Sequence, residues 1–399
     1  MKSYIPRNHY MEKIRPFIGE DLIKVFTGQR RVGKSYMLYQ LMDEIRGLEG
    51  DANFIYINME LYEFKEIRTH KELYSYVKPR KSGKKNYLFI DEIQVIEGFE
   101  IAIRSILAEG GTDIYITGIN ADLLSGELAT HLGGRYIEVR IHPLSYNEFL
   151  NFHSLSAGED SLGKYLRYGG LPCLKNLELT DEVIFDYLHN IYQSILYRDI
   201  VSRFEVRNVQ FLNNLVIYLA THAGNLISAR NIEKYLKSQK IHISTALIIN
   251  YLDYLNKAFF TIKISRSDIQ GKRIFETGGK HYFNDLGIRN AIAGFRPPDM
   301  GILVENAVFN HLNYLGYKVN VGKSGEKEVD FIAQRNNIKI YVQACYLIQD
   351  GTTFSREFGN LMSIKDQFPK YVVSMDPLVT KDSYEGIIQL GLSEFLKWE

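Results

Sequence analysis

The sequence predicts an α/β protein in which a parallel β-sheet, covered by helices on both faces, is followed by smaller modules. Three observations lead to this fold class. Apolar runs rich in β-branched and aromatic residues alternate with helical patterns over residues 20–140. A glycine-rich stretch directly follows the first of these runs. The chain has 399 residues, which is enough for about two or three domains.

Five apolar runs are predicted as the strands of this sheet. Each is apolar along most of its length, which is typical of strands buried on both faces. Helical patterns separate most of the runs, so we expect parallel strands joined by crossover helices. The runs are "LIKVFTG" (22–28), "ANFIYINM" (52–59), "NYLFIDE" (86–92), "DIYITGIN" (113–120) and "RYIEVRI" (135–141).

The composition is that of an ordinary globular protein, with 45% hydrophobic and 24% charged residues. A net charge of +1 predicts no overall positive field that would attract nucleic acid. A local patch of basic residues remains compatible with this value. The sequence has no apolar run of about 18 residues and no apolar signal segment at its start, so we expect no membrane span. The two cysteines, Cys173 and Cys345, lie far apart, which favours a reducing, cytoplasmic location.

The stretch "GQRRVGKS" (28–35) fits the phosphate-loop pattern G-x-x-x-x-G-K-[ST] between a strand and a helix. The two glycines allow a tight turn, the helix N-terminus attracts phosphate, Lys34 can reach the β- and γ-phosphates, and Ser35 can bind Mg²⁺. The alternative is a basic turn without a ligand, which would not require this spacing. We therefore predict an ATP site with Mg²⁺, whose nucleotide-binding residues are Gly28, Gln29, Arg30, Arg31, Val32, Gly33, Lys34, Ser35 and Tyr36.

Two acids end the strand in "YLFIDEI" (87–93). Asp91 is the predicted metal ligand together with Ser35, and Glu92 is the predicted general base that polarises the attacking water. The alternative is a strand that ends in acids without a catalytic role. The next strand ends in "TGIN" and places Thr117 or Asn120 at the same sheet edge, where a polar side chain can orient water. A simple loop cap is the alternative there.

Negative charge on the γ-phosphate must be stabilised in the transition state, so we expect an arginine near it. The first candidate is Arg135, at the start of the fifth run, acting within one chain or across the interface of a homo-oligomer. Arg198 and Arg203, in "YRDIVSRF", are rival candidates from the helical part. Each of the three could instead be a surface arginine.

An ordered set of motifs resembles a known family. The motifs are "FTGQRRVGKS", "LFIDEIQ", "ITGIN", "GGRYIEVRIHPLSYNEFL", "YGGLP", "RDIV" and "KHYFND". They are similar, over nearly the whole chain, to bacterial and archaeal predicted ATPases with an AAA-type P-loop domain and a C-terminal domain of unknown function. The resemblance implies an AAA+ core, a winged helix-turn-helix and a restriction-endonuclease-like C-terminal domain, but no established substrate. It implies that the family's nucleotide-binding and catalytic positions correspond here to Lys34, Ser35, Asp91 and Glu92, and also to Asn120 and Arg135.

We predict four parts: an AAA+ core (1–140), a helical lid or connector (141–204), a winged helix-turn-helix (205–295) and the restriction-endonuclease-like domain (296–399). Caps at Ser228 and Ser244 start two helices of the third part, and two strands would form its wing. The second of these helices carries few basic residues, so contact with DNA and contact with protein stay equally open. "FRPPDM" (295–300) is the predicted linker.

The last part is expected to contain a helix, the strands "KEVDFIAQ" and "IKIYVQACYLI", a further helix and a last strand, "KYVVSMD". Nuclease cores of the implied fold place an acid on the first helix, an Asp on a strand and acid-x-Lys on the next strand. Here Glu305 and Asp330 fit, but Gln343 stands for the acid and Cys345 for the lysine. An amide is a poor Mg²⁺ ligand and a thiol is not a cation, so we expect a degenerate nuclease site.

Three functions remain open at this point. The first is a Mg²⁺-dependent ATPase that moves the downstream parts, with DNA as a candidate target. The second is a slow signalling ATPase that acts through protein partners. The third is a nuclease gated by ATP. Expected partners are therefore ATP or ADP, DNA or protein, and further copies of the chain.

Overall fold

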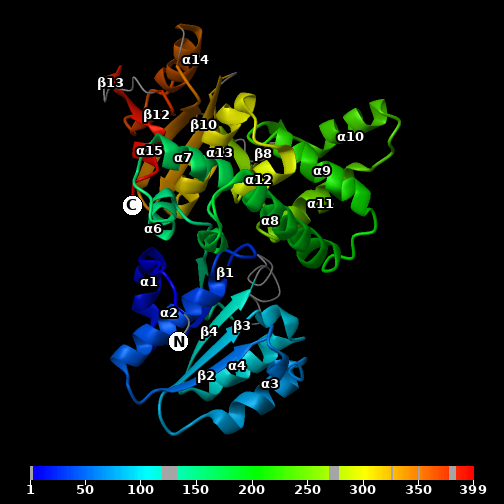
Figure 1. The fold of residues 1–399 in the computed structure, drawn as a ribbon, viewed down its shortest axis with the longest axis vertical. Coiled ribbons are helices and arrows are strands. Elements are labelled where there is room, and N and C mark those ends of the chain that lie inside the picture. Colours follow the sequence, from blue (N-terminus) through cyan, green and yellow to red (C-terminus); the bar gives the residue numbers. More distant parts are fainter. Residues whose placement is uncertain (1–2, 119–132, 269–277, 325–326, 349–350, 377–382) are drawn as a thin grey trace. The chain divides into compact units, whose positions relative to one another are not determined.

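The computed structural model describes residues 3–118, 133–268, 278–324, 327–348, 351–376 and 383–399 (Figure 1). The chain divides into two compact units. The first comprises Met1–His142 and Lys257–Phe259, and the second comprises Pro143–Asn256 and Phe260–Glu399.

The first unit is built on a sheet of five parallel strands in the order β2-β3-β4-β1-β5. All five predicted strands are confirmed to within two residues at each end. This order places β1 between β4 and β5. The segment that follows β1 therefore has a neighbouring strand on each side. The strands are β1 (Ile23–Thr27), β2 (Asn53–Asn58), β3 (Asn86–Asp91), β4 (Thr112–Gly118) and β5 (Tyr136–Arg140).

Helices cover both faces of this sheet (Figure 1). Ile23 and Val25 of β1 join the apolar core beneath α3 and α4, whereas Phe26 faces the other side because successive strand residues alternate. A row of aromatic rings, Phe54, Phe89 and Tyr115, stacks across the strands. The helices are α1 (Asn8–Ile14), η1 (Arg15–Phe17), α2 (Lys34–Leu48), η2 (Tyr62–Phe64), α3 (His70–Val77), η3 (Lys78–Arg80), η4 (Ile93–Val95) and α4 (Phe99–Glu109).

The second unit begins with helices, as the sequence predicts. The hydroxyls of Ser228 and Ser244 accept backbone N–H groups of Asn231 and Leu247, which confirms both predicted caps. The helices are α6 (Tyr146–Phe152), α7 (Glu159–Tyr168), η6 (Pro172–Asn176), α8 (Asp181–Ser194), the π-helix η7 (Ile195–Val201), α9 (Val209–Thr221), α10 (Ala229–Ser238), α11 (Thr245–Lys257), α12 (Leu286–Ala293), η8 (Pro297–Asp299), α13 (Met300–Tyr314), α14 (Gly351–Met362) and α15 (Leu392–Phe395).

One nine-stranded sheet runs through this unit in the order β13-β14-β12-β11-β10-β9-β7-β8-β6. The parallel pairing of β7 with β9 connects the two halves of this sheet, and in it Arg266 lies opposite Val321. The segments 205–295 and 296–399, predicted as separate parts, therefore share one sheet. The strands are β6 (Leu226–Ile227), β7 (Thr261–Asp268), β8 (Gly279–Phe283), β9 (Lys318–Ser324), β10 (Lys327–Arg335), β11 (Ile338–Cys345), β12 (Lys370–Ser374), β13 (Ser383–Tyr384) and β14 (Ile387–Gly391).

The prediction that "KYVVSMD" is the last strand is wrong. That run forms β12, and β13, β14 and α15 follow it. The sequence analysis also did not predict β9. In β9, "KVNVGKS", only alternate positions are apolar and a glycine interrupts the run, so the local strand signal is weak. The pairing of β9 with both β7 and β10 supplies the missing stabilisation.

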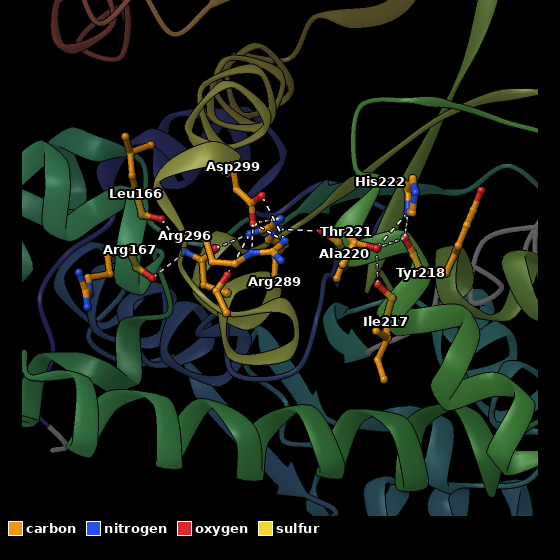
Figure 2. A network of polar contacts seen from close by, with 12 residues as sticks. Leu166, Arg167, Ile217, Tyr218, Ala220, Thr221, His222, Arg289, Arg296 and Asp299 are labelled. Carbon is orange, nitrogen blue, oxygen red and sulfur yellow. Dashed lines mark hydrogen bonds and ion pairs between the residues drawn. The ribbon is translucent and has the colours of Figure 1, made fainter.

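A fully buried arginine joins three elements of the second unit (Figure 2). The Nε of Arg289 on α12 donates to the carbonyl of Ala220 near the end of α9, at 2.8 Å. Its Nη2 donates to the carboxylate of Asp299 at 2.9 Å, and Arg296 contacts the same carboxylate at 3.0 Å. Because a buried charge is costly unless it is paired, this network holds α9, α12 and η8 in one arrangement.

The "YGGLP" and "KHYFND" motifs meet at the start of α12. The carboxylate of Asp285 accepts N–H groups of Gly170 and Ile288, at 2.8 and 2.9 Å. Burial raises the pKa of Asp285 to about 6, although these N–H donors favour its charged form. Gly287 fits against the carbonyl of Tyr168, where an added Cβ would lie 2.0 Å from the oxygen. The close approach of α7 and α12 therefore requires a residue without a side chain.

Replacing that glycine should destabilise the second unit. We expect Gly287→Ala to lower the free energy of unfolding by about 1–3 kcal/mol, because α12 must move away from α7. Denaturation followed by the fluorescence of Trp398 measures this, since the only tryptophan packs on Phe395 in the same unit. Gly301→Ala on α13 is the matched control, because an added Cβ there meets nothing within 4 Å. Equal midpoints for the two variants would contradict the packing argument.

Candidate nucleotide-binding site

The predicted phosphate loop lies between β1 and α2. Gly28 has φ +144° and lies against the residue that follows β5, where an added Cβ would be 2.3 Å from the carbonyl oxygen of Ile141. Gly33 has φ +96° and precedes the first residue of α2. Arg31, between them, has φ +71°. Left-handed conformations at these positions turn the chain tightly, so that it passes from a buried strand into a helix whose N-terminus faces the loop.

Lys34 lies inside this loop. It is the first residue of α2 and is only 4% exposed. Its Nζ donates to the carbonyls of Gly28 and Gln29, at 3.0 and 3.1 Å, and lies 3.9 Å from a carboxylate oxygen of Glu92. The ammonium is therefore held at the centre of the turn, where an anion bound by the loop amides would meet it.

The predicted acid pair lies at the carboxyl end of β3. Asp91 is buried, and the hydroxyl of Thr117 on β4 donates to it at 2.6 Å. Burial raises the pKa of Asp91, while hydrogen bonds from the hydroxyls of Thr117 and Ser35 act in the opposite direction. The backbone N–H of Glu92 donates to the Thr117 hydroxyl at 2.9 Å. Lys34 and Ser35, at the start of α2, are thus brought together with Asp91 and Glu92, at the end of β3.

Glu92 has a strained backbone. Its φ is +60°, which is uncommon for a residue with a side chain. The side chain is largely buried, accepts a hydrogen bond from the amide of Gln94 and lies near Lys34. Strain of this kind persists where the surrounding structure holds a side chain in a required direction. Here that direction is toward the phosphate loop.

The remaining predicted nucleotide-binding residues differ in exposure. Gln29, Arg30 and Val32 are buried, whereas Arg31 and Tyr36 are exposed. The guanidinium of Arg30 lies 3.7 Å from the carboxylate of Glu60, in the segment after β2. Arg30 therefore fixes the loop to its neighbour and does not point freely into solvent, while Arg31 and Tyr36 are accessible to a ligand.

The first arginine candidate lies at the opposite edge of the sheet from the phosphate loop, because β5 runs parallel to β1 and the loop follows the carboxyl end of β1. Arg135 is exposed just before β5, and its carbonyl accepts the backbone N–H of Ile23. Arg198, within η7, and Arg203, after it, are exposed residues of the second unit. Asn120 lies outside the described residues, so only Thr117 of the two polar candidates is placed.

Sequence reasoning missed two contacts beside the loop. The hydroxyl of Thr27, at the end of β1, donates to a carboxylate oxygen of Glu138 on β5. Glu60 was likewise not predicted as the partner of Arg30. Both acids follow or interrupt predicted strands in the sequence, but their pairing depends on the strand order. A polar residue within an otherwise apolar run, as at Glu138, was the available signal.

A second cluster of charges lies in the second unit. The Nζ of Lys280 on β8 lies 2.9 Å from Glu305 on α13, and 3.1 Å from both Glu328 and Asp330 on β10. Burial alone would lower the pKa of Lys280, but the three carboxylates raise it above its usual value. Burial and Asp330 raise the pKa of Glu305 to about 7. An ammonium therefore lies among the acids that include both nuclease candidates.

The other positions of the predicted nuclease pattern surround Asp330. Gln343 accepts the backbone N–H of Asp330 at 3.2 Å, and the Asp330 carboxylate accepts the N–H of Ala344 at 3.0 Å. Cys345 is buried, and its burial raises the pKa of its thiol to about 12. The side-chain amide of Gln343 thus forms a hydrogen bond with the backbone of β10. Lys280 is the cation of this cluster, and the "KHYFND" motif that contains it was the signal in the sequence.

Removing the ammonium should destabilise the second unit strongly. We expect Lys280→Met to lower the free energy of unfolding by about 3–5 kcal/mol, because three acids lose their buried partner. Denaturation followed by Trp398 fluorescence measures the change. Lys263→Met, at an exposed position of the neighbouring β7, is the matched control and should shift stability by less than about 0.5 kcal/mol. A Lys280→Met variant as stable as the control would rule out a stabilising role of the cluster.

Among the described residues, no group of three or more His, Cys, Asp or Glu side chains is arranged to hold a metal ion by itself. Within the same residues, no helix has the length and apolar character needed to cross a membrane.

Comparison with known proteins identifies the family. Residues 20–150 match the AAA domain, and residues 159–299 match a domain of unknown function (DUF8612). An uncharacterised protein of Haemophilus influenzae is 36% identical over 382 residues, which cover 94% of each chain. The chain belongs to this AAA+ family. An uncharacterised protein of Methanocaldococcus jannaschii is 32% identical to this AAA+ protein over 348 residues, 82% of this chain and 75% of the relative.

Three solved structures resemble this AAA+ protein at low identity. The Aeropyrum pernix ORC1 protein in complex with DNA matches with 12% identity and a TM-score of 0.34, covering 73% of this chain and 93% of that one. The Thermotoga maritima RuvB Holliday junction branch migration motor matches with 14% identity and a TM-score of 0.34, covering 65% and 90%. AMPPCP-bound DnaA from Aquifex aeolicus matches with 15% identity and a TM-score of 0.33, covering 50% and 70%. With TM-scores this low, these likenesses carry no argument about the chain.

Proposed function

We propose that the protein is a Mg²⁺-dependent AAA+ ATPase that couples ATP binding and hydrolysis to movement of its second unit, with DNA as a candidate target. The observation that carries this proposal is the convergence of Lys34, Ser35, Asp91 and Glu92 at one end of the five-stranded sheet. These side chains supply the cation, the hydroxyl and the two carboxylates that phosphoryl transfer to water requires.

Each residue has a distinct role in this proposal. The loop amides and Lys34 bind the phosphates, and Ser35 with Asp91 holds Mg²⁺, which neutralises phosphate charge when it is bound. Glu92 accepts a proton from the attacking water. Thr117 positions both acids, because its hydroxyl donates to the Asp91 carboxylate and accepts the N–H of Glu92. Arg135 remains the first candidate for the arginine that stabilises charge in the transition state, acting from a second copy, because within one chain it lies at the opposite edge of the sheet.

The architecture of the second unit supports a winged helix followed by a restriction-endonuclease-like part. Helices α9, α10 and α11 precede the strands β7 and β8, and β8 pairs with both β6 and β7. This is the arrangement expected of a helix-turn-helix with a wing. Glu305 on α13, Asp330 on β10 and Gln343 on β11 occupy the elements expected of a nuclease core.

A specific observation favours the alternative of a signalling ATPase that acts through protein contacts. The helix α11, which would be the recognition helix on DNA, carries only Asp253 and Lys257 as charged residues. Binding to DNA normally requires several cations on that element. The ATP-gated nuclease is not favoured, because the ammonium of Lys280 lies among the carboxylates that would have to bind a metal.

The test is the rate of ATP hydrolysis at rising protein concentration, with and without duplex or single-stranded DNA. A rate per chain that rises with concentration indicates an arginine supplied by a second copy. Stimulation by DNA supports the DNA target, and slow turnover that ignores DNA supports the signalling alternative. Absence of both ATP binding and hydrolysis would overturn the proposal.

A further inference from the structure

A hollow lies between α9 and α10 in the second unit. Its volume is about 490 Å³, and apolar and aromatic side chains from both helices line it. Large apolar side chains remain open to solvent at its edge: Ile217 is 48% exposed, Tyr235 57% and Ile241 43%. Exposed apolar side chains gathered along one concave surface are typical of a site that binds another molecule. We call this surface the α9–α10 groove; its lining includes Leu215, Ile217, Tyr218, Ile232, Tyr235 and Ile241.

Positive charges predominate in the segment that forms the groove. Helix α9 contains no charged residue. Residues 209–243 contain four Lys or Arg residues and one acid, which gives a net charge of +3. The acid, Glu233, lies 2.8 Å from Lys237 and accepts a hydrogen bond from Thr245. The cations, all exposed, are Arg230, Lys234, Lys237 and Lys240. An occupant with an apolar face and acidic flanks would therefore be complementary to the groove and its edge.

The shape and composition favour a helical peptide over nucleic acid. A groove between two helices, lined by apolar side chains, accepts the apolar face of a third helix through residues spaced at i, i+3, i+4 and i+7. Nucleic acid would need phosphate-binding cations on the contact surface itself. Here the contact surface is apolar, and the cations lie on α10 and in the turn after it.

We propose that the α9–α10 groove binds an amphipathic helix of a partner protein, with apolar residues on one face and Asp or Glu on its flanks. The apolar face fills the groove against Ile217 and Tyr235, and the acidic flanks lie along the cations of α10. This interaction does not require ATP hydrolysis, so it can be tested independently of the nucleotide site.

Isoleucine methyl NMR of the full chain tests the proposal, because isoleucines lie both inside and outside the groove. The probe is a synthetic helical peptide of about 18 residues, long enough to form a helix, with Leu at i, i+3, i+4 and i+7 and Glu on the flanks. We expect saturable shifts of the Ile217 and Ile241 methyl signals. Ile249 on α11, which is 54% exposed but does not line the groove, should not move.

Two variants, a basic peptide and duplex DNA test whether the groove itself binds the acidic peptide. Ile217→Ser should weaken binding of the acidic peptide by about tenfold or more, whereas the matched control Ile249→Ser should leave it unchanged. The proposal is overturned if the acidic peptide leaves the Ile217 and Ile241 signals unmoved at about 1 mM. It is also overturned if a peptide with Lys in place of Glu binds equally well. Short duplex DNA that shifts the same signals and displaces the peptide would identify a nucleic-acid surface instead.

Discussion

The variant Lys34→Ala should lose ATP affinity by about 100- to 1,000-fold, which corresponds to the removal of a buried charged contact. The ammonium of Lys34 lies within the loop, on the carbonyls of Gly28 and Gln29, so its loss removes the positive charge held at the centre of the turn. Alanine is a good helix former, and α2 should persist. Isothermal calorimetry with ATP measures the affinity.

Two controls separate this loss from unfolding. Far-ultraviolet circular dichroism should show the same helix and strand content as the natural protein. Lys65→Ala removes an exposed lysine of the same unit, near Glu66, and should bind ATP normally. Unchanged ATP affinity of Lys34→Ala would mean that residues 28–35 are not the phosphate site.

The variant Glu92→Gln should bind ATP but hydrolyse it about 10²–10⁴-fold more slowly. The amide has nearly the same shape as the carboxylate but cannot accept the proton of the attacking water. Phosphate release under saturating ATP, together with analysis of the bound nucleotide, measures the effect. The bound fraction should be intact ATP.

Glu97→Gln is the matched control for this change. Glu97 is an exposed acid of the same segment, after η4, and its replacement should leave turnover unchanged. If the Glu92→Gln variant hydrolyses ATP as fast as the Glu97→Gln variant, another group accepts the proton of the attacking water. The left-handed backbone of Glu92 would then have a role other than positioning a general base.

The first unit could be predicted well from the sequence because its signals are local. The strands β1 to β4 are mostly apolar runs, and the phosphate loop is a fixed spacing of residues that are neighbours in the chain. The placement of Asp91 beside Ser35 then follows from the rule that parallel strands end at one edge. The contact of Arg30 with Glu60 did not follow, because it depends on which strand lies next to which.

The second unit was harder to predict because its organisation depends on pairings between distant segments. The strand β9 has a weak local pattern and is stabilised by β7 and β10 on either side. The position of Lys280 among three acids requires α13, β8 and β10 to be in place together. No spacing in the sequence expresses that arrangement, so Glu305 and Asp330 were predicted as parts of a degenerate nuclease site, and the lysine was given no role.

The parallel pairing of β7 with β9 has a consequence for how such chains can change in evolution. A recombination event at the "FRPPDM" linker that replaced everything after it would leave β7 without its neighbour, and Lys280 with none of its three acids. An exposed strand edge of that kind pairs readily with other chains and promotes aggregation. The two halves of the nine-stranded sheet are therefore expected to be inherited as one piece.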